Sequence, residues 1–208
     1  MTRVKICGLT RGTDVDAAVD AGADALGFLV DVPVDTPREI DAATAATLVD
    51  RVPPLVTTVL VTMAETPTRV AALAALTGVD AVQLHGPLAT DLAPVRAALD
   101  QPVIAAVDPG DAHDATAADA ILLDTPTTDG AGGTGTTHDW DRAATITADL
   151  ATPVVLAGGL TPDTVATAVE TVDPYAVDVA TGVEATGGQK DHDAVHAFVA
   201  TATGGHGS

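Results

Sequence analysis

The chain has 208 residues, of which 29 are acidic and 9 are basic, and its formal net charge is −20. An apolar fraction of 47% excludes a disordered chain in spite of this charge, and the aromatic content of 2% means that the core is built mainly from Ala, Val and Leu. The negative charge argues against nucleic acids and anionic membranes as partners, since both would be repelled.

Short β-rich segments alternate with Ala-rich amphipathic segments from one end of the chain to the other. The predicted strands are residues 4–7, 25–30, 56–61, 81–84, 103–107, 120–124, 154–157 and 176–179. The predicted helices are residues 14–21, 41–52, 67–76, 88–99, 139–150, 162–172 and 191–201. Thr66-Pro67 and Thr161-Pro162 indicate helix starts, because Thr can cap a helix and Pro suits its first position. The segment 108–119 is short and rich in Asp, so the fifth helix is expected to be short or missing.

Eight strand–helix units fit into the chain at about 26 residues each, close to the minimum for a strand, a crossover helix and two turns. The alternation indicates an α/β protein with a parallel sheet. Eight units favour a closed (β/α)8 barrel, or TIM barrel, over an open doubly wound sheet. No linker divides the chain, so we expect one barrel domain over residues 1–202 and a flexible Gly-rich C-terminal tail over residues 203–208.

A single cysteine cannot form an internal disulfide, which fits a reducing compartment. The N-terminal sequence MTRVKICGLTRGTDVD lacks the apolar run of a signal peptide, and no stretch approaches 18 uninterrupted apolar residues. We therefore expect a cytoplasmic protein that is either a monomer or a homodimer.

Cys7, at the end of the first predicted strand, is the first candidate functional residue. Chemistry in a barrel of this kind takes place at the C-terminal ends of the strands. Side chains alternate along a strand, so Lys5 and Cys7 should point into the barrel while Val4 and Ile6 face the helices. A nearby ammonium group would favour the thiolate form of Cys7; the alternative is a buried, inert thiol.

Two further polar residues are expected inside the barrel or at the C-terminal ends of its strands. Asp178 lies on the inward side of the last predicted strand, which neighbours the first strand in a closed barrel, so we predict a buried ion pair between Asp178 and Lys5. His85 follows the fourth strand, where it either orients a ligand or simply ends the strand.

Asp124 closes the apolar sixth strand, where a carboxylate is costly unless it is paired or used. The Gly-rich segment 125–137 after it is either a loop that closes over a ligand or a plain surface loop. Arg38, in the loop after the second strand, is suited to bind a carboxylate through two parallel hydrogen bonds. The alternative for Arg38 is a solvent-exposed side chain or one that pairs with Glu39.

Two glycine-containing loops follow the seventh and eighth strands. The first contains Gly158 and Gly159, and the second contains Ala180, Thr181 and Gly182. In many barrels these two loops bind a phosphate through backbone N–H groups, and glycine lets the backbone approach the oxygen atoms closely. We predict a phosphate site here, with tight turns as the alternative use of the glycines.

Taken together, these segments resemble one known family. The resemblance is carried by Lys5-Ile6-Cys7-Gly8-Leu9-Thr10, Thr36-Pro37-Arg38, Val82-Gln83-Leu84-His85-Gly86, Leu122-Leu123-Asp124-Thr125, Gly132-Gly133-Thr134-Gly135, Asp139-Trp140, Leu156-Ala157-Gly158-Gly159-Leu160, Thr181-Gly182-Val183-Glu184 and Lys190-Asp191. In this order they are similar to the phosphoribosylanthranilate isomerases of tryptophan biosynthesis, from residue 4 to about residue 198.

The resemblance implies an Amadori rearrangement of N-(5-phosphoribosyl)anthranilate, without a metal or an organic cofactor. It implies Cys7 as the general base and Asp124 as the general acid, with the pKa of the carboxyl group raised and that of the thiol lowered. It implies that Arg38 binds the anthranilate carboxylate and that Gly159 and Ala180-Thr181-Gly182 bind the phosphate.

The chain departs from the family's pattern at the ends of the second and third strands. Val30 and Leu60 stand where an aromatic residue is frequent, which puts aromatic packing on the anthranilate ring in question. Two other functions are weighed: a sister isomerase of the histidine pathway, which uses an aspartate where Cys7 stands, and a non-catalytic barrel that binds phosphosugars.

The surface charge leads to the first prediction. Only two residues are lysines, and Asp outnumbers Glu by 25 to 4, which favours a protein adapted to high salt over the alternative, an ordinary acidic enzyme. Self-repulsion of the surface destabilises the folded state unless salt screens it, so the melting temperature should rise with salt concentration. Thermal unfolding followed by circular dichroism checks this expectation, and equal melting temperatures in dilute buffer and in molar salt would contradict it.

Overall fold

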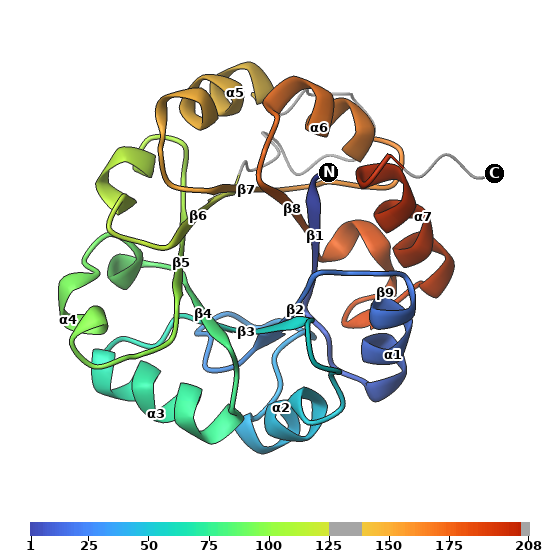
Figure 1. Ribbon diagram of the computed structural model, residues 1–208. Helices are drawn as coiled ribbons and strands as arrows, with labels where there is room; N and C mark the ends of the chain where they lie inside the picture. Colours follow the sequence, from blue (N-terminus) through green and yellow to red (C-terminus); the bar gives the residue numbers. More distant parts are fainter. Residues whose placement is uncertain (125–138, 205–208) are drawn as a thin grey trace.

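The computed structural model describes residues 1–124 and 139–204. Eight parallel strands form a closed barrel in chain order (Figure 1). They are β1 (Arg3–Cys7), β2 (Ala25–Leu29), β3 (Thr57–Thr62), β4 (Ala81–Leu84), β5 (Val103–Val107), β6 (Ala120–Asp124), β7 (Val154–Ala157) and β8 (Ala176–Val179). The barrel closes where β8 pairs with β1, in a register that sets Lys5 beside Asp178. The predicted fold class is therefore confirmed.

Helices surround the barrel as an outer ring (Figure 1). They are α1 (Gly12–Asp20), α2 (Ala42–Val49), α3 (Pro67–Thr77), α4 (Ala93–Arg96), α5 (Trp140–Asp149), α6 (Val165–Val172) and α7 (His192–Ala202). Short 3-10 helices are η1 (Pro87–Ala89), η2 (Ala112–Ala115) and η3 (Thr181–Val183), and β9 (Glu184–Thr186) pairs with β10 (Gln189–Lys190) as a hairpin. The longest helices in the described ranges, α3 and α7, have 11 residues each, and none there is long and apolar enough to cross a membrane.

All eight predicted strands are present, with bounds that differ by at most one residue. Thr66 caps α3 as predicted, by accepting a hydrogen bond from the backbone N–H of Arg69. The crossover between β5 and β6 contains only η2, in agreement with the expected reduced fifth helix. The Gly-rich segment 125–137 and residues 205–208 of the expected tail lie outside the described residues.

Three helix predictions were wrong. The helix predicted over residues 41–52 ends at Val49. The predicted helix 88–99 is broken into η1 and α4, because Pro94 lacks a backbone N–H and its ring clashes with the carbonyl four residues earlier. The helix predicted from residue 162 begins at Val165, because Thr164 accepts a hydrogen bond from the N–H of Thr161 at 3.0 Å and holds these residues in a turn. The β9–β10 hairpin was not predicted.

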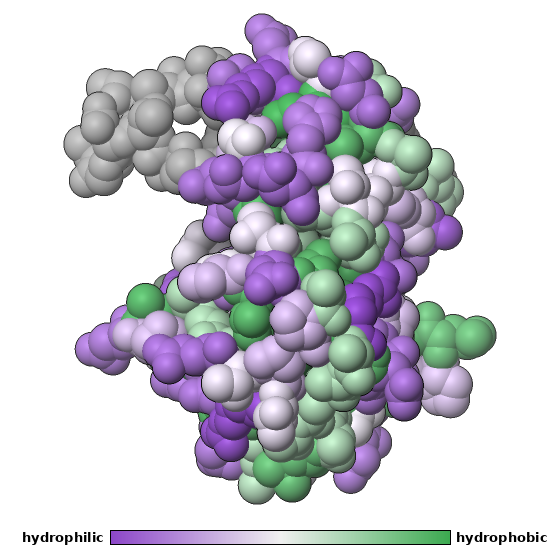
Figure 2. All heavy atoms as spheres, turned by 90° about the vertical axis from the view of Figure 1, so that its left-hand side faces the viewer, coloured by the Kyte–Doolittle hydropathy of each residue, from purple (hydrophilic) through white to green (hydrophobic). Residues whose placement is uncertain are grey.

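The sheet separates two apolar layers. The larger layer lies between the strands and the helices and includes the fully buried Phe28 and Phe198. Inside the barrel the apolar side chains are smaller, among them Ala106, Ala157 and Ala176. Small residues inside the barrel leave room for polar side chains at its C-terminal mouth. On the outer face in Figure 2, hydrophilic residues are interspersed with small hydrophobic patches.

Three aspartates secure the opposite, N-terminal end of the barrel. Asp24, Asp80 and Asp119 each precede an even-numbered strand and accept a hydrogen bond from the backbone N–H of the neighbouring odd-numbered strand, at 2.8, 2.8 and 2.7 Å. Asp80 also accepts a hydrogen bond from the Thr58 hydroxyl at 2.7 Å. These carboxylates satisfy N–H groups at the strand starts that would otherwise lack a partner in the sheet.

Asp80→Ala should destabilise the fold but leave the C-terminal mouth of the barrel unchanged. It leaves the N–H and the hydroxyl of Thr58 without their acceptor, which should lower the free energy of unfolding by about 1–3 kcal/mol. Urea unfolding measures the difference. Asp100→Ala, which removes the same charge from an exposed residue, is the control, and equal losses in the two variants would contradict the assigned role.

Candidate active site

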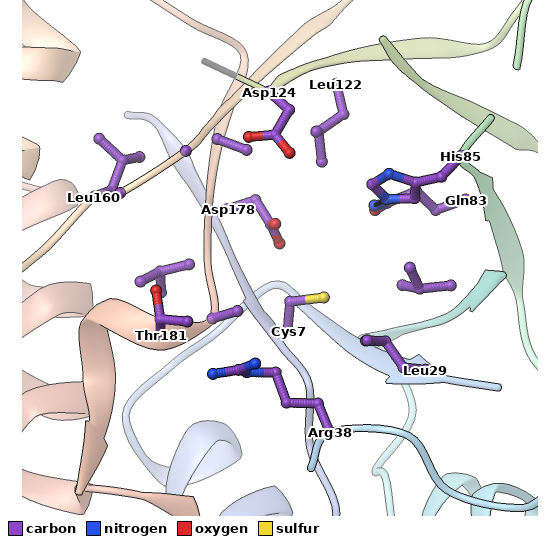
Figure 3. A pocket seen from close by; sticks show the side chains of 16 residues that line it. Cys7, Leu29, Arg38, Gln83, His85, Leu122, Asp124, Leu160, Asp178 and Thr181 are labelled. Carbon is purple, nitrogen blue, oxygen red and sulfur yellow. Dashed lines mark hydrogen bonds between the residues drawn. The ribbon is translucent and has the colours of Figure 1, made fainter. Parts of the chain in front are cut away.

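A cavity of about 260 Å³ opens at the C-terminal ends of the strands. Figure 3 shows that side chains from both the early and the late strands point into it. The lining includes these predicted residues: Cys7, Arg38, His85, Asp124, Gly158, Gly159, Asp178, Ala180 and Thr181. The predicted residues Lys5, which is buried, and Gly182 are not among the lining residues.

Gly27 on β2 makes room for the thiol of Cys7. A Cβ atom added at Gly27 would lie 2.8 Å from the Cys7 Sγ atom and 3.0 Å from the Lys5 Nζ atom. The thiol and the ammonium group therefore both lie over the Cα atom of this glycine. The close approach requires a residue without a side chain, and the sequence reading did not identify Gly27 as part of the site.

Lys5 and Asp178 form the predicted ion pair, with Nζ and Oδ1 2.7 Å apart. Both side chains are buried inside the barrel. Burial by itself would lower the pKa of Lys5, but Asp178, and to a lesser extent Cys7, outweigh burial and raise it. Lys5 is therefore a permanent cation beneath the thiol.

The pKa of the Cys7 thiol is raised, which contradicts the expected downward shift. Burial disfavours the thiolate more than the neighbouring Lys5 favours it, and Asp178 disfavours it further. The sequence placed the ammonium group correctly, but it did not reveal how completely the barrel removes the thiol from water. At neutral pH the resting cysteine is therefore a thiol.

Asp124 ends β6 and faces the same cavity as Cys7 (Figure 3). Its pKa is raised as expected, first by desolvation and then by the negative charges of Asp178 and Asp108. A group that lies near two other carboxylates and holds its proton more tightly than usual is suited to donate that proton to a ligand.

Arg38 pairs with Glu184, and not with Glu39. Its Nε atom donates to Glu184 Oε1 at 2.9 Å, and its Nη2 atom donates to Oε2 at 2.7 Å. Lys190 is a second partner of Glu184, at 3.0 Å. Glu184 and Lys190 were not predicted as site residues and appear in the sequence analysis only within motifs. Nothing in the local sequence indicates that the loop after β8 reaches the loop after β2.

The two predicted phosphate loops are packed directly against each other. Gly158 and Gly159 have positive φ angles of 92° and 60°, which favour glycine. A Cβ atom at Gly182 would collide with the carbonyl oxygen of Leu160, so the second loop can lie this close to the first only with glycine at that position. The lining residues of both loops form one wall of the cavity.

His85 is held by a residue that the sequence reading did not single out. The Nε2 atoms of Gln83 and His85 are 2.8 Å apart, so the amide of Gln83 donates to the imidazole ring. Burial, and then the charge of Lys5, lower the pKa of His85, which keeps it neutral. Among the described residues, Gln83 Oε1 is buried without a hydrogen-bond partner. Within the same part of the chain, no group of three His, Cys, Asp or Glu residues is arranged to hold a metal ion.

Comparison with known proteins identifies similar chains. The model of the N-(5'-phosphoribosyl)anthranilate (PRA) isomerase family matches residues 4–201. Curated N-(5'-phosphoribosyl)anthranilate isomerases from the halophilic archaea Natronomonas pharaonis and Halobacterium salinarum are 56% and 57% identical to this chain. Both alignments cover 98% of this chain, together with 99% and 96% of the respective relative.

Solved structures agree with this result. Phosphoribosyl anthranilate isomerase from Thermotoga maritima superimposes with a TM-score of 0.86 at 38% identity, over 98% of this chain and all of that one. A phosphoribosyl anthranilate isomerase in complex with reduced 1-(o-carboxyphenylamino)-1-deoxyribulose 5-phosphate gives a TM-score of 0.82 at 35% identity, with the same coverage.

The ion pair between Lys5 and Asp178 allows a prediction about the ionisation of the Cys7 thiol. Asp178→Asn removes a negative charge that opposes the thiolate, so it should lower the pKa of Cys7, whereas Lys5→Met removes the favourable ammonium group and should raise it. Cys7 is the only cysteine, so thiolate absorbance followed against pH reports this group alone. Asp100→Asn is the control, and shifts of the same sign in the Asp178 and Lys5 variants would refute the assignment.

Proposed function

The chain belongs to the N-(5'-phosphoribosyl)anthranilate isomerase family, and from this premise we propose how its residues perform the reaction. The enzyme converts N-(5-phosphoribosyl)anthranilate into 1-(2-carboxyphenylamino)-1-deoxyribulose 5-phosphate, an Amadori rearrangement in tryptophan biosynthesis. The observation that carries the assignment of roles is that Cys7 and Asp124 face one cavity, between the glycine loops and Arg38.

Asp124 is the general acid. Its raised pKa keeps the carboxyl group protonated to a higher pH than that of an ordinary aspartate. It donates its proton to the furanose ring oxygen, the bond between this oxygen and C1 breaks, and the lone pair of the anthranilate nitrogen forms a C=N bond to C1. The product of this step is an open-chain iminium ion. The nitrogen of the substrate acts as the electron sink, so we propose that no metal or organic cofactor takes part.

Cys7 is the general base. Its thiolate removes the proton from C2, the electrons of the C–H bond form a C1=C2 double bond, and the iminium nitrogen becomes neutral. The resulting enolamine tautomerises to the ketone. The raised pKa of the resting thiol opposes this step, so the thiol first loses its own proton to solvent, and the small fraction of thiolate performs the step. Lys5 stabilises this thiolate, whereas burial and Asp178 oppose it.

The two anionic ends of the substrate occupy opposite sides of the cavity. Arg38 binds the anthranilate carboxylate, and the backbone of Gly158, Gly159 and 180–182 binds the phosphate. Both loops are part of the cavity wall, and the missing side chain of Gly182 allows their close packing, which brings the two stretches of backbone together. His85, which is neutral and held by Gln83, orients a substrate hydroxyl group.

The apolar contacts to the anthranilate ring come from Leu29 and Val61, which line the cavity. Val30 and Leu60, where aromatic residues are frequent in the family, are buried in the outer layer between the sheet and the helices. The lack of an aromatic residue at these two positions therefore does not affect the ring-binding side of the cavity.

The location and assembly of the enzyme are part of the proposal. We place it in the cytoplasm, because its one cysteine is a buried free thiol. A Thermotoga maritima structure with a TM-score of 0.82 is described as monomers generated from a dimeric phosphoribosylanthranilate isomerase, so both a monomer and a homodimer are compatible with this fold.

Substitutions at the two proton-transfer groups test the mechanism. Cys7→Ser and Asp124→Asn should each lower kcat by about 10²–10⁴-fold, because each removes one proton-transfer group. The decrease in fluorescence of the substrate follows turnover. Asp111→Asn, which removes another carboxylate from a neighbouring pocket that Asp124 also lines, should stay close to the wild type. Full activity in the Cys7 or the Asp124 variant would remove the role assigned to that residue.

A further inference from the structure

Arg38 presents only part of its guanidinium group to the cavity. Its Nε and Nη2 atoms are both used by the carboxylate of Glu184, whose side chain is 5% exposed. The remaining nitrogen, Nη1, donates one N–H to the hydroxyl of Thr36 at 3.3 Å and keeps a second N–H. An arginine held by one carboxylate in this bidentate way has a fixed orientation, and its other edge stays available to a ligand.

Lys190 is a second partner of the Glu184 carboxylate. The Lys190 Nζ atom lies 3.0 Å from Glu184 Oε1 and donates to the carbonyl oxygen of Ala180 at 2.9 Å. Burial opposes the charge on Glu184, but Arg38 and Lys190 outweigh burial and lower its pKa, so it stays ionised. The carboxylate that holds Arg38 is thus connected through Lys190 to the carbonyl of Ala180 in the loop after β8.

The β9–β10 hairpin, which begins with Glu184, is fixed in place by close backbone packing. A Cβ atom at Gly188 would collide with the carbonyl oxygen of Pro37, and one at Gly187 would lie 2.7 Å from the Pro37 ring. Thr10 donates to the carbonyl oxygen of Gly188 at 2.6 Å. The loops after β1, β2 and β8 therefore form a single rigid unit around Arg38.

We propose that Glu184 and Lys190 are positioning residues that set the spacing between the two anionic subsites. Glu184 turns the Nη1 edge of Arg38 toward the cavity, and Lys190 fixes this unit to the Ala180 carbonyl in the phosphate loop. The formal charges of Arg38, Lys190 and Glu184 sum to +1; burial lowers the pKa of Lys190, and its contact with Glu184 opposes that shift. The inference rests on the proposed role of Arg38, and it extends that role to selection for ligands that carry two anionic groups at a fixed distance.

Binding of two stable ligands tests this inference. One is the reduced 1-(o-carboxyphenylamino)-1-deoxyribulose 5-phosphate, and the other is its phenylamino counterpart, which lacks the carboxyl group. Glu184→Gln should weaken binding of the first ligand about tenfold, the typical effect of one misaligned charge-assisted contact, and leave binding of the second unchanged. In turnover the same variant should raise KM more than it lowers kcat. Glu39→Gln, at an exposed residue next to Arg38, is the matched control.

Other results would overturn the inference. Tighter binding of the carboxyl-bearing ligand by Glu184→Gln would mean that Glu184 competes with the ligand for Arg38. Equal weakening of both ligands would mean a purely structural role. Glu184→Asp keeps the charge and therefore the fold, but it is one methylene shorter, so it should weaken only the carboxyl-bearing ligand. Unchanged binding of both ligands by this variant would also contradict the proposal.

A variant of the arginine separates this inference from the proposed function. Arg38→Met should abolish the difference in affinity between the two ligands. If Arg38→Met discriminates between them as the wild type does, the proposed carboxylate role of Arg38 fails. If Arg38→Met loses discrimination but both Glu184 variants retain it, Arg38 keeps its role and only the positioning role of Glu184 and Lys190 is refuted.

Discussion

The ion pair between Lys5 and Asp178 joins the closure of the barrel to its chemistry. The pair lies across the junction of β1 and β8, where the register sets the two residues side by side with Nζ and Oδ1 2.7 Å apart. Leaving either charge buried alone would be costly, so the pair favours this register over its alternatives. The same two charges act on Cys7 with opposite sign, and Asp178 also acts on Asp124. The contact that closes the barrel therefore contributes, together with the larger effect of burial, to the pKa values of Cys7 and Asp124.

Much of the architecture follows from local signals, because the strands are short apolar runs between turns and the Thr66-Pro67 start specifies a helix by itself. The errors have local causes too: Pro94 breaks a helix whose apolar spacing is otherwise suitable. The site was predictable where it depends on strand alternation, as for Cys7 and Lys5. It was not predictable where it depends on tertiary distance, as for the contact between Arg38 and Glu184, 146 positions apart.

The direction of the Cys7 pKa shift also depends on the tertiary structure and could not be predicted from the local sequence. The sequence indicates an ammonium group near the thiol, and this alone favours the thiolate. Burial acts in the opposite direction and is the larger effect. Burial depends on the closed barrel, and on Gly27, which allows the thiol to lie against the β2 backbone. In the proposed mechanism, a base that is protonated at rest is protected from unproductive reactions of a free thiolate.

The distribution of positive charge accounts for binding of an anionic substrate by a protein with a net charge of −20. Within residues 1–124 and 139–204, five arginines form ion pairs with carboxylates, namely Arg11, Arg38, Arg51, Arg69 and Arg96. The two lysines, Lys5 and Lys190, are both buried beside the cavity. Molar salt reduces the Debye length to about 3 Å, which removes the long-range repulsion of the surface but screens buried contacts much less. High salt therefore lets the anionic substrate approach while the local cationic groups of the site keep their effect.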